Sequence, residues 1–185
     1  MTALPVRRDQ RRAPLPVSWT LLVHRARLLA SYLDRAGVRP GDRVAVDLPA
    51  GPARTALTYA CWQSGMTVVV SDQALTTGER IDAFASAGPT ALVSTSTGLR
   101  ASRSISSVRV RVAAEPLTVV ARAVLHSGWD ERDLSRERLA AHASAAHASP
   151  AEVPAEAAVV VGQDADGQPS LTSYSQDELV PLATA

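Results

Sequence analysis

The residues whose types and spacing could do chemistry lie near the carboxyl end of the chain, where Asp164 and Asp166 stand in the Gly- and Asp-rich stretch 162–169. This stretch directly follows Ala157–Val161, whose uninterrupted apolar residues predict a buried strand. Two carboxylates so close together could hold a metal ion, but no further ligands follow at the expected spacing. We therefore favour an ordinary Asp/Gly turn and predict no metal site.

The four histidines do not form a metal site or a catalytic group in the sequence. His142 and His147 lie five residues apart on a helix predicted over 130–148, which turns their side chains about 140° from one another. They cannot share a metal ion from one helix face, as a pair four residues apart could. His24 and His126 stand alone, and we interpret all four as surface or helix-end residues.

Cys61 belongs to a helix predicted to start at Pro52, whose inner face also carries Ala53, Leu57 and Ala60. A thiol becomes a nucleophile when a nearby base or positive charge lowers its pKa, and no histidine lies near this one in the sequence. We therefore interpret the cysteine as a small core residue. A single cysteine cannot form an internal disulfide, so we expect a reducing, cytoplasmic location.

Composition limits the class of protein. With 185 residues, 46% of them hydrophobic, the chain is long enough to bury one globular core. Its net charge of +1 gives no overall attraction to nucleic acid or to a membrane. No run approaches the roughly 18 apolar residues that cross a bilayer. All 19 basic residues are arginine, so the chain contains no lysine.

Residues 1–14 are predicted to form a flexible basic arm. A solvated tail is favoured over a nucleic-acid contact because no aromatic residues interleave its arginines. Arg7-Arg8 also occurs in twin-arginine export signals, but the segment 15–33 that follows is interrupted by basic residues and a histidine, and so lacks an apolar signal core. We expect neither a nucleic-acid nor a membrane partner.

Predicted helices and strands alternate through the first half of the chain. Short strands that alternate with helices indicate a parallel sheet with right-handed crossovers. The predicted fold class is therefore α/β, with a mostly parallel sheet and helices on both faces. The expected elements are a helix from an N-cap at Ser18 to about Ala36, a strand over Arg43–Leu48, a helix from Gly51-Pro52 to Gly65, a strand over Thr67–Val70, a helix over Thr76–Ala87 and a strand over Thr90–Ser94.

Beyond residue 94 the alternation loosens, and Val108–Val112 reads as a half-exposed strand because valine alternates with arginine. We still expect residues 15–185 to form a single domain, with a linker near 149–156. The other elements expected here are a Ser- and Arg-rich loop over 95–107, a strand over Leu117–Ala121, a helix over 130–148 and a strand over Ala157–Val161.

Three stretches, in their order and spacing, resemble the N-terminal subdomain of the acyl-adenylating superfamily: GVRPGDRVAVDLP at 37–49, SGMTVVV at 64–70 and LTTGER at 75–80. That superfamily includes acyl-CoA synthetases, luciferases and the adenylation domains of peptide synthetases. Ser18-Trp19-Thr20 occupies the place of the threonine-rich start of its first helix. The resemblance covers most of 18–94 and continues more weakly over 157–179. In length the chain is similar to short, stand-alone actinobacterial relatives.

The resemblance assigns Gly162–Leu171 to the loop that binds ATP phosphates, which reads TSGTTGxPKG in the family. Glycines let the backbone N–H groups of such a loop cradle the phosphates, and its lysine adds positive charge. Gly167 and Pro169 match this pattern, and Ser170 replaces the lysine. Asp164 and Asp166 are new carboxylates. Each close carboxylate–phosphate pair is repulsive by on the order of 1 kcal/mol even in water. We therefore expect a degraded loop, weak or no ATP binding and no cofactor.

The chain ends soon after this loop and has no lysine for the catalytic role that the small C-terminal domain fills in the family. We therefore predict a non-catalytic relative, without catalytic residues, that serves as a binding or regulatory module. The alternatives are a split acyl-adenylate or acyl-CoA ligase component that needs a second chain, and a decaying gene product without a maintained role.

A partner is expected because a second large subdomain packs against this sheet in full-length relatives. The apolar run Ala157–Val161 would otherwise form a sticky edge or an exposed patch. We expect a homodimer or a protein partner to cover it, unless a local element such as Leu179–Leu182 does so.

Overall fold

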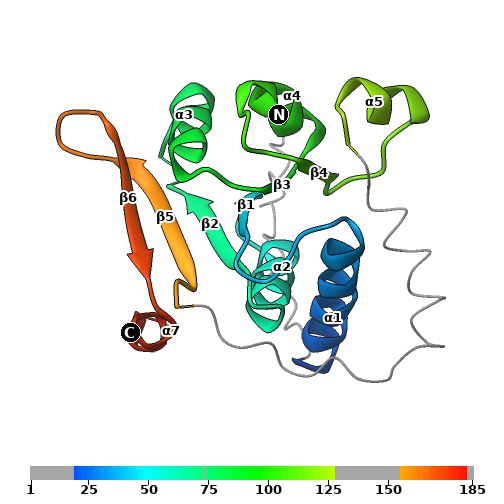
Figure 1. The fold of residues 1–185 in the computed structure, drawn as a ribbon, viewed down its shortest axis with the longest axis horizontal. Helices are drawn as coiled ribbons and strands as arrows, with labels where there is room; N and C mark the ends of the chain where they lie inside the picture. Colours follow the sequence, from blue (N-terminus) through cyan, green and yellow to red (C-terminus); the bar gives the residue numbers. More distant parts are fainter. Residues whose placement is uncertain (1–18, 73, 128–154, 183–185) are drawn as a thin grey trace, which may run out of the picture.

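The structure, a computed structural model, describes residues 19–72, 74–127 and 155–182, which form a six-stranded sheet with helices on both faces (Figure 1). The strands run in the order β4-β3-β1-β2-β5-β6, and neighbouring strands are parallel except for β5 and β6. The strands are β1 (Arg43–Asp47), β2 (Thr67–Ser71), β3 (Ala91–Ser94), β4 (Val110–Ala113), β5 (Ala158–Gln163) and β6 (Pro169–Tyr174). The helices are α1 (Trp19–Arg35), α2 (Pro52–Gln63), α3 (Thr77–Ala87), α4 (Ser96–Ala101), the short 3₁₀ helix η1 (Ser102–Ser104), α5 (Val119–Val124) and α7 (Gln176–Leu182).

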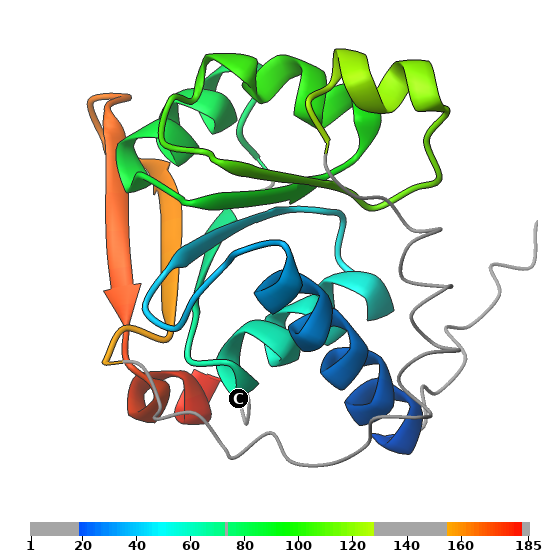
Figure 2. The ribbon, with the colours of Figure 1, turned by 45° about the vertical axis from the view of Figure 1, so that its right-hand side comes forward.

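Each face of the sheet has its own apolar core. Successive side chains of a strand point to opposite faces, so Val44 and Val46 of β1 join the core under α1 and α2, whereas Ala45 joins the core under α3 and α4. Figure 2 shows the two groups of helices on opposite sides of the sheet. The predicted fold class, α/β with a mostly parallel sheet covered on both faces, is confirmed.

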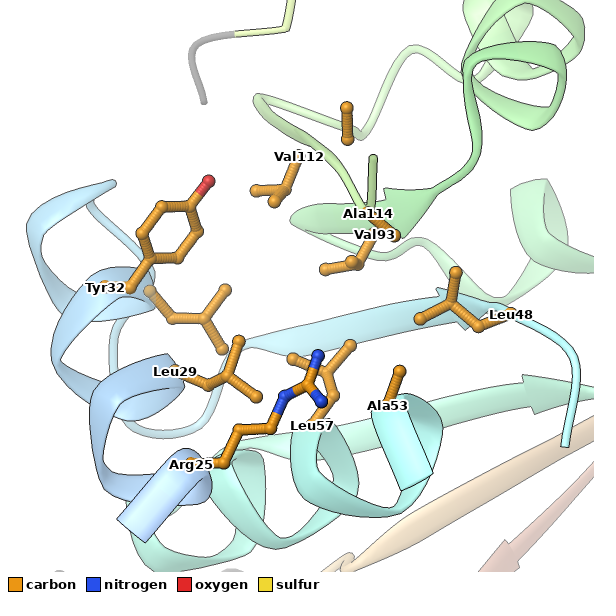
Figure 3. A pocket seen from close by; sticks show the side chains of 11 residues that line it. Arg25, Leu29, Tyr32, Leu48, Ala53, Leu57, Val93, Val112 and Ala114 are labelled. Atoms are coloured by element: carbon orange, nitrogen blue, oxygen red, sulfur yellow. The ribbon is translucent and has the colours of Figure 1, made fainter. Parts of the chain in front are cut away.

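The layer of α1 and α2 packs over β1 and reaches over β3 towards the edge strand β4. Figure 3 shows Leu29 and Tyr32 of α1 and Leu57 of α2 on one side, with Val93 of β3 and Val112 of β4 on the other. Because the chain has few aromatic residues, valine, leucine and alanine fill most of this core. Branched side chains of this size suit strands that are buried on both faces.

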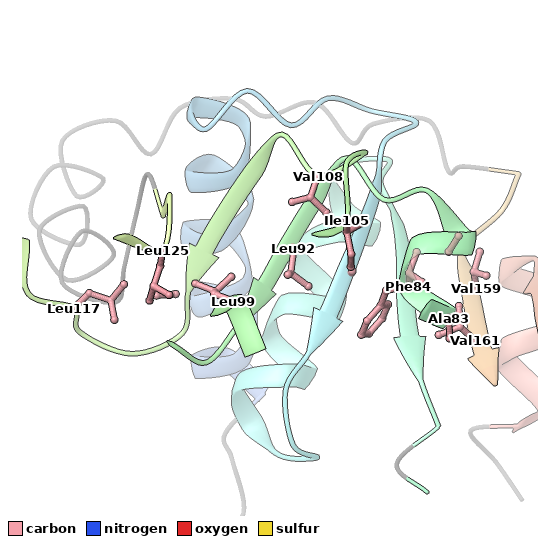
Figure 4. Packing of buried hydrophobic residues seen from close by; sticks show 14 residues of the cluster. Ala83, Phe84, Leu92, Leu99, Ile105, Val108, Leu117, Leu125, Val159 and Val161 are labelled. Carbon is pink, nitrogen blue, oxygen red and sulfur yellow. The ribbon is translucent and has the colours of Figure 1, made fainter. Parts of the chain in front are cut away.

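The opposite core is built around α3. Phe84, the single phenylalanine of the chain, is buried there with Ala83 against Val159 and Val161 of β5 (Figure 4). The helix begins with a reciprocal cap: the Thr76 hydroxyl accepts a hydrogen bond from the backbone N–H of residue 79, whose side chain accepts one from the N–H of Thr76 at 2.7 Å. The apolar contacts hold α3 against β5.

The helices and strands predicted up to residue 94 are confirmed, whereas the predicted basic arm over 1–14 lies outside the described residues. The predicted helices and strands up to residue 94 match α1, β1, α2, β2, α3 and β3 to within two residues at either end, for the ends that lie among the described residues. The half-exposed strand predicted over Val108–Val112 corresponds to β4. No helix in the described ranges is long and apolar enough to cross a membrane.

Several predictions for the second half are wrong. The expected loop over 95–107 contains α4 and η1, because the Thr95 hydroxyl accepts a hydrogen bond from the N–H of Gly98 and starts a helical turn. The expected strand over Leu117–Ala121 begins α5 instead, since Thr118 caps that helix in the same way. The predicted helix over 130–148 falls outside the described residues, as does nearly all of the predicted linker.

The apolar run Ala157–Val161 does not form a sheet edge. It lies almost entirely within β5, which pairs with β2 on one side and with β6 on the other. A local element therefore covers it, but that element is the unpredicted strand β6 rather than Leu179–Leu182. The hairpin of β5 and β6 also sets the position of the predicted phosphate loop.

Candidate functional site

The predicted phosphate-loop residues lie in the turn between β5 and β6, at the tip of the antiparallel hairpin (Figure 1). Gly162 belongs to the end of β5, and Pro169 and Ser170 open β6, where Ser170 pairs in register with Gly162. Gly167 has a φ angle of 74°. Glycine adopts this left-handed conformation without strain, which explains its place at the tightest point of the turn.

The carboxylate of Asp164 binds the backbone of its own turn. Its Oδ1 atom accepts hydrogen bonds from the N–H groups of Asp166 at 3.0 Å and Gln168 at 2.8 Å. The Asp164 carbonyl accepts the N–H of Gly167 at 3.0 Å. Successive N–H groups in a turn are the groups that would cradle an anion. Here two of these N–H groups donate to a carboxylate of the protein itself.

No group of three or more His, Cys, Asp or Glu side chains is placed to hold a metal ion in the ranges that the structure describes. The Asp164 carboxylate is engaged by backbone N–H groups, as in an ordinary Asp turn. His24 and His126 are both exposed, whereas His142 and His147 lie outside the described residues.

Cys61 is fully buried in α2, as predicted for a core residue. Burial raises the pKa of its thiol to about 12, so it stays protonated at neutral pH and is a poor nucleophile. Leu57 and Ala60 are buried beside it, but Ala53 is exposed and Ala56 takes its place on the inner face. The predicted inner face of the helix is therefore confirmed at three of its four positions and is wrong at Ala53.

A pocket that the sequence analysis missed opens at the carboxyl ends of β1, β2 and β3, and its volume is about 330 Å³. We call it the carboxyl-edge pocket. After β1 the chain crosses to the face of α2, whereas after β2 and β3 it crosses to the face of α3 and α4. In open α/β sheets, ligands bind where successive connections part in this way.

Asp47, the last residue of β1, forms the floor of the carboxyl-edge pocket. Its Oδ1 atom lies 3.4 Å from the Nε atom of Arg80 in α3, and its Oδ2 atom accepts the buried hydroxyl of Ser94 at 2.8 Å. Gly98 of α4 approaches the same atoms so closely that an added Cβ would lie 1.9 Å from Ser94 Oγ and 2.5 Å from Asp47 Oδ2. Only glycine lets α4 come this near to the floor.

The charged side chains that line the pocket are two guanidinium groups and one carboxylate. Arg80 pairs with Asp47, while Arg54 of α2 makes no ion pair within the described residues. Thr77 and Thr97 add hydroxyl groups to the lining. An excess of one positive charge, with hydroxyls beside it, suits a small anionic ligand that also forms hydrogen bonds.

The helix ends around the pocket are already occupied by side chains of the protein. Hydrogen bonds from Thr76 lower the pKa of Glu79, which caps α3. Hydrogen bonds to Ser96 likewise lower the pKa of Glu115, whose Oε1 atom accepts the N–H of Ser96 at 2.8 Å at the start of α4. An anion in the pocket would therefore be held by the arginine side chains and not by free helix ends.

A signal for this pocket was present in the sequence. Asp47 is the last residue but one of a predicted strand and Ser94 is the last residue of another, and polar residues at the carboxyl ends of neighbouring parallel strands meet at one edge. The strand order β3-β1-β2, which brings them together, was not predicted.

A profile of the AMP-binding enzyme family matches residues 12–163 of this chain, and so ends directly before Asp164. Among solved structures, the chain is similar to VinN in complex with 3-methylaspartate, with a TM-score of 0.67 and 17% identity over 90% of this chain and 42% of that one. No curated protein sequence matches it significantly.

Two further structures show the same likeness. The adenylation domain of the carboxylate reductase from Mycobacterium chelonae has a TM-score of 0.67 and 18% identity over 90% of this chain and 28% of that one. MatB from Rhodopseudomonas palustris has a TM-score of 0.62 and 22% identity over 91% of this chain and 31% of that one. The chain therefore spans less than half the length of each of these proteins, and at such identities the likeness shows the fold.

Proposed function

This chain belongs to the AMP-binding enzyme family, and we propose that it is a non-catalytic member that acts as a binding module. The observation that supports this most directly is the hydrogen bonding of the Asp164 carboxylate to the N–H groups of residues 166 and 168. An ATP phosphate would have to displace this carboxylate from its own turn, and the two groups repel each other. Ser170 stands where the resemblance places a lysine, so that lysine cannot offset the repulsion.

The ligand of this module is proposed to be a small anion held in the carboxyl-edge pocket. The pocket is of ligand size, lies where the strand connections part, and offers the guanidinium of Arg54 together with that of Arg80. The excess positive charge favours a compact anionic group. Binding here would not need the altered loop, which lies at the tip of the hairpin.

The lack of catalysis is tested by acid-dependent exchange of pyrophosphate into ATP. The pure protein is incubated with a panel of carboxylic acids that includes aspartate and 3-methylaspartate, the ligands of the structurally similar VinN. We expect no exchange above the background without acid. Exchange that depends on any acid of the panel would contradict the proposal.

Calorimetry with ATP tests whether the hydrogen bonds of Asp164 to its own turn prevent nucleotide binding. We expect binding of the unaltered protein at millimolar strength at most, which corresponds to about −4 kcal/mol. Replacing Asp164→Ser, Asp166→Thr and Ser170→Lys should raise the affinity, because the N–H groups become free and a cation enters. A control with the same change in net charge, Asp82→Ser, Gln176→Lys and Asp177→Thr, should leave it unchanged. Micromolar binding by the unaltered protein would refute the degraded loop.

A component of a two-chain adenylating enzyme is the second candidate. It is favoured by the match of the chain to the AMP-binding enzyme family, whose chemistry a second chain would complete. Purification from the native host, read by mass spectrometry, would identify a second chain, and acid-dependent exchange by the complex would decide for this candidate. Light scattering on a sizing column tests whether the protein forms a homodimer. The edges of β5 are not open to such a contact, because they pair with β2 and β6.

A further inference from the structure

A second hollow lies between α1, α2 and the strands β3 and β4 (Figure 3). We call it the helix-layer pocket, and its volume is about 40 Å³. Its walls are aliphatic, with Leu29 of α1, Leu57 of α2 and Val93 of β3 among them. The one charged side chain in its lining is Arg25 of α1.

Arg25 brings to this apolar hollow a positive charge that no described residue compensates. Figure 3 shows its guanidinium reaching from α1 across to α2, towards Leu57 and Ala53. The side chain is half-buried, and it makes no ion pair within the residues that the structure describes. A partly desolvated cation without a partner raises the free energy of the folded protein.

The elements around Arg25 have no carboxylate to spare for it. α2, β3 and β4 contain no aspartate or glutamate, and the single acid of α1, Asp34, pairs with Arg39. The acid of β1, Asp47, pairs with Arg80 on the far face of the sheet. Glu115, just beyond β4, caps α4. No carboxylate in the described part of the protein is therefore available to neutralise Arg25.

We propose that the helix-layer pocket binds a small amphipathic monoanion, with its charged group on Arg25 and a short aliphatic tail in the hollow. The charge of the guanidinium selects the anion, and the apolar walls select the tail. One water molecule needs about 10–15 Å³ of such space, so the hollow takes a tail of about three carbon atoms. Butyrate and 1-propanesulfonate have this tail and this charge.

This site is separate from the carboxyl-edge pocket. The two pockets share Leu48 as a wall, but their arginines differ: Arg25 serves one, whereas Arg54 and Arg80 serve the other. A ligand can therefore be present in either without the other. The two sites are distinguished by the backbone amides that shift when a ligand is added.

The test is a titration followed by amide chemical shifts. Butyrate and 1-propanesulfonate should each shift the amides of Leu29 and Leu57, whereas uncharged butyramide should bind about tenfold more weakly because it cannot pair with the guanidinium. Octanoate should bind no better than butyrate, because its tail exceeds the hollow. If neither anion shifts these amides, or if butyramide binds as well as butyrate, the proposal is overturned.

Three variants show whether the effect belongs to the pocket. Arg25→Gln should weaken butyrate binding about tenfold, whereas Arg27→Gln, which removes an exposed charge from the same helix, should leave it unchanged. Ala53→Leu should fill the hollow and abolish binding while keeping Arg25, and the dispersion of its spectrum shows whether it has folded. Equal weakening by Arg25→Gln and Arg27→Gln would reveal a general charge effect and overturn the site. Loss of phosphate binding at the carboxyl-edge pocket would leave this result untouched.

Discussion

The amino and carboxyl ends of the parallel strands differ in how their charges are used. At the amino ends, Arg43 of β1 holds Glu156 through two hydrogen bonds of 2.9 Å and also donates to the carbonyl of Ala87 at the end of α3. Glu156 accepts the Ser173 hydroxyl from β6 at 2.7 Å, and its carbonyl accepts the Thr67 hydroxyl from β2 at 2.6 Å. Side chains of the protein therefore tie four elements together there.

At the carboxyl ends, the charges line a hollow instead. Asp47 has two partners, Arg80 and Ser94, but Arg54 makes no ion pair in the described residues, and about 330 Å³ stays open between them. Loops at the carboxyl ends of parallel strands are free to diverge, which is why sites gather there. We infer that the amino edge contributes stability, whereas binding at the carboxyl edge is our proposal, and the predictions below test these two roles.

The largest effect is expected from removing the ion pair of Arg43 with Glu156 at the amino edge. Arg43→Gln removes the charge from three hydrogen bonds and leaves Glu156 half-buried without its cation, which should cost about 2–3 kcal/mol of unfolding free energy. Arg54→Gln at the other edge should change stability by less than about 0.5 kcal/mol. Urea unfolding measures both. If the two variants were equally destabilised, the edges would not differ as proposed.

The next effect concerns the close approach of α4 to the carboxyl-edge pocket. Gly98→Ala should destabilise the fold by about 1–2 kcal/mol, because its Cβ would overlap the buried hydroxyl of Ser94 and the carboxylate of Asp47. Gly78→Ala in α3 is the matched control, since nothing lies within 4 Å of its added Cβ. That control should be neutral or stabilised by up to about 1 kcal/mol. Equal thermal stabilities of the two variants would argue against the tight floor.

The sequence predicted the central strands and helices well because their signals are local. Gly37, Pro40 and Gly65 separate the elements, and apolar runs such as Thr67–Val70 can only be buried. β6 was missed because Pro169–Tyr174 carries polar residues on both faces, so its strand state depends on pairing with β5. α5 was taken for a strand because valine dominates it and the cap at Thr118 was overlooked.

The two candidate sites were predictable to different degrees. An altered phosphate loop could be predicted from the sequence, since Asp164 and Ser170 replace residue types on which that chemistry depends. How the loop closes could not, because the hydrogen bonds of Asp164 depend on the turn between β5 and β6. The carboxyl-edge pocket depends on strand order, which non-local packing decides and which no short motif encodes.

A smaller effect is expected on anion binding at the carboxyl-edge pocket. Inorganic phosphate, followed by amide shifts, should move the amides of Thr77, Thr95 and Thr97. Arg54→Gln should weaken that binding roughly fivefold, which corresponds to about 1 kcal/mol, while Arg43→Gln at the amino edge should not alter it in protein that remains folded. No shift at these amides, or equal weakening by both variants, would remove the binding role from this edge.

The smallest effect is a pH dependence that the amino edge confers through Glu156. Burial raises the pKa of this carboxyl, but hydrogen bonds from Arg43 and Ser173, with the charge of Arg43, outweigh it and hold the pKa below its ordinary 4.5. A carboxyl with a lowered pKa stabilises the fold above its unfolded pKa, and the contribution is lost as the pH falls through the folded value. The stability gap between the unaltered protein and Glu156→Gln should therefore be constant from pH 7 to about 5 and should narrow below about 4.5.

Glu115→Gln, which removes a more exposed carboxyl from the opposite edge, should show a gap of the same sign but smaller at every pH. Urea unfolding across this range measures both gaps; one that widened on acidification for Glu156→Gln would mean that burial, and not Arg43, controls the ionisation of Glu156.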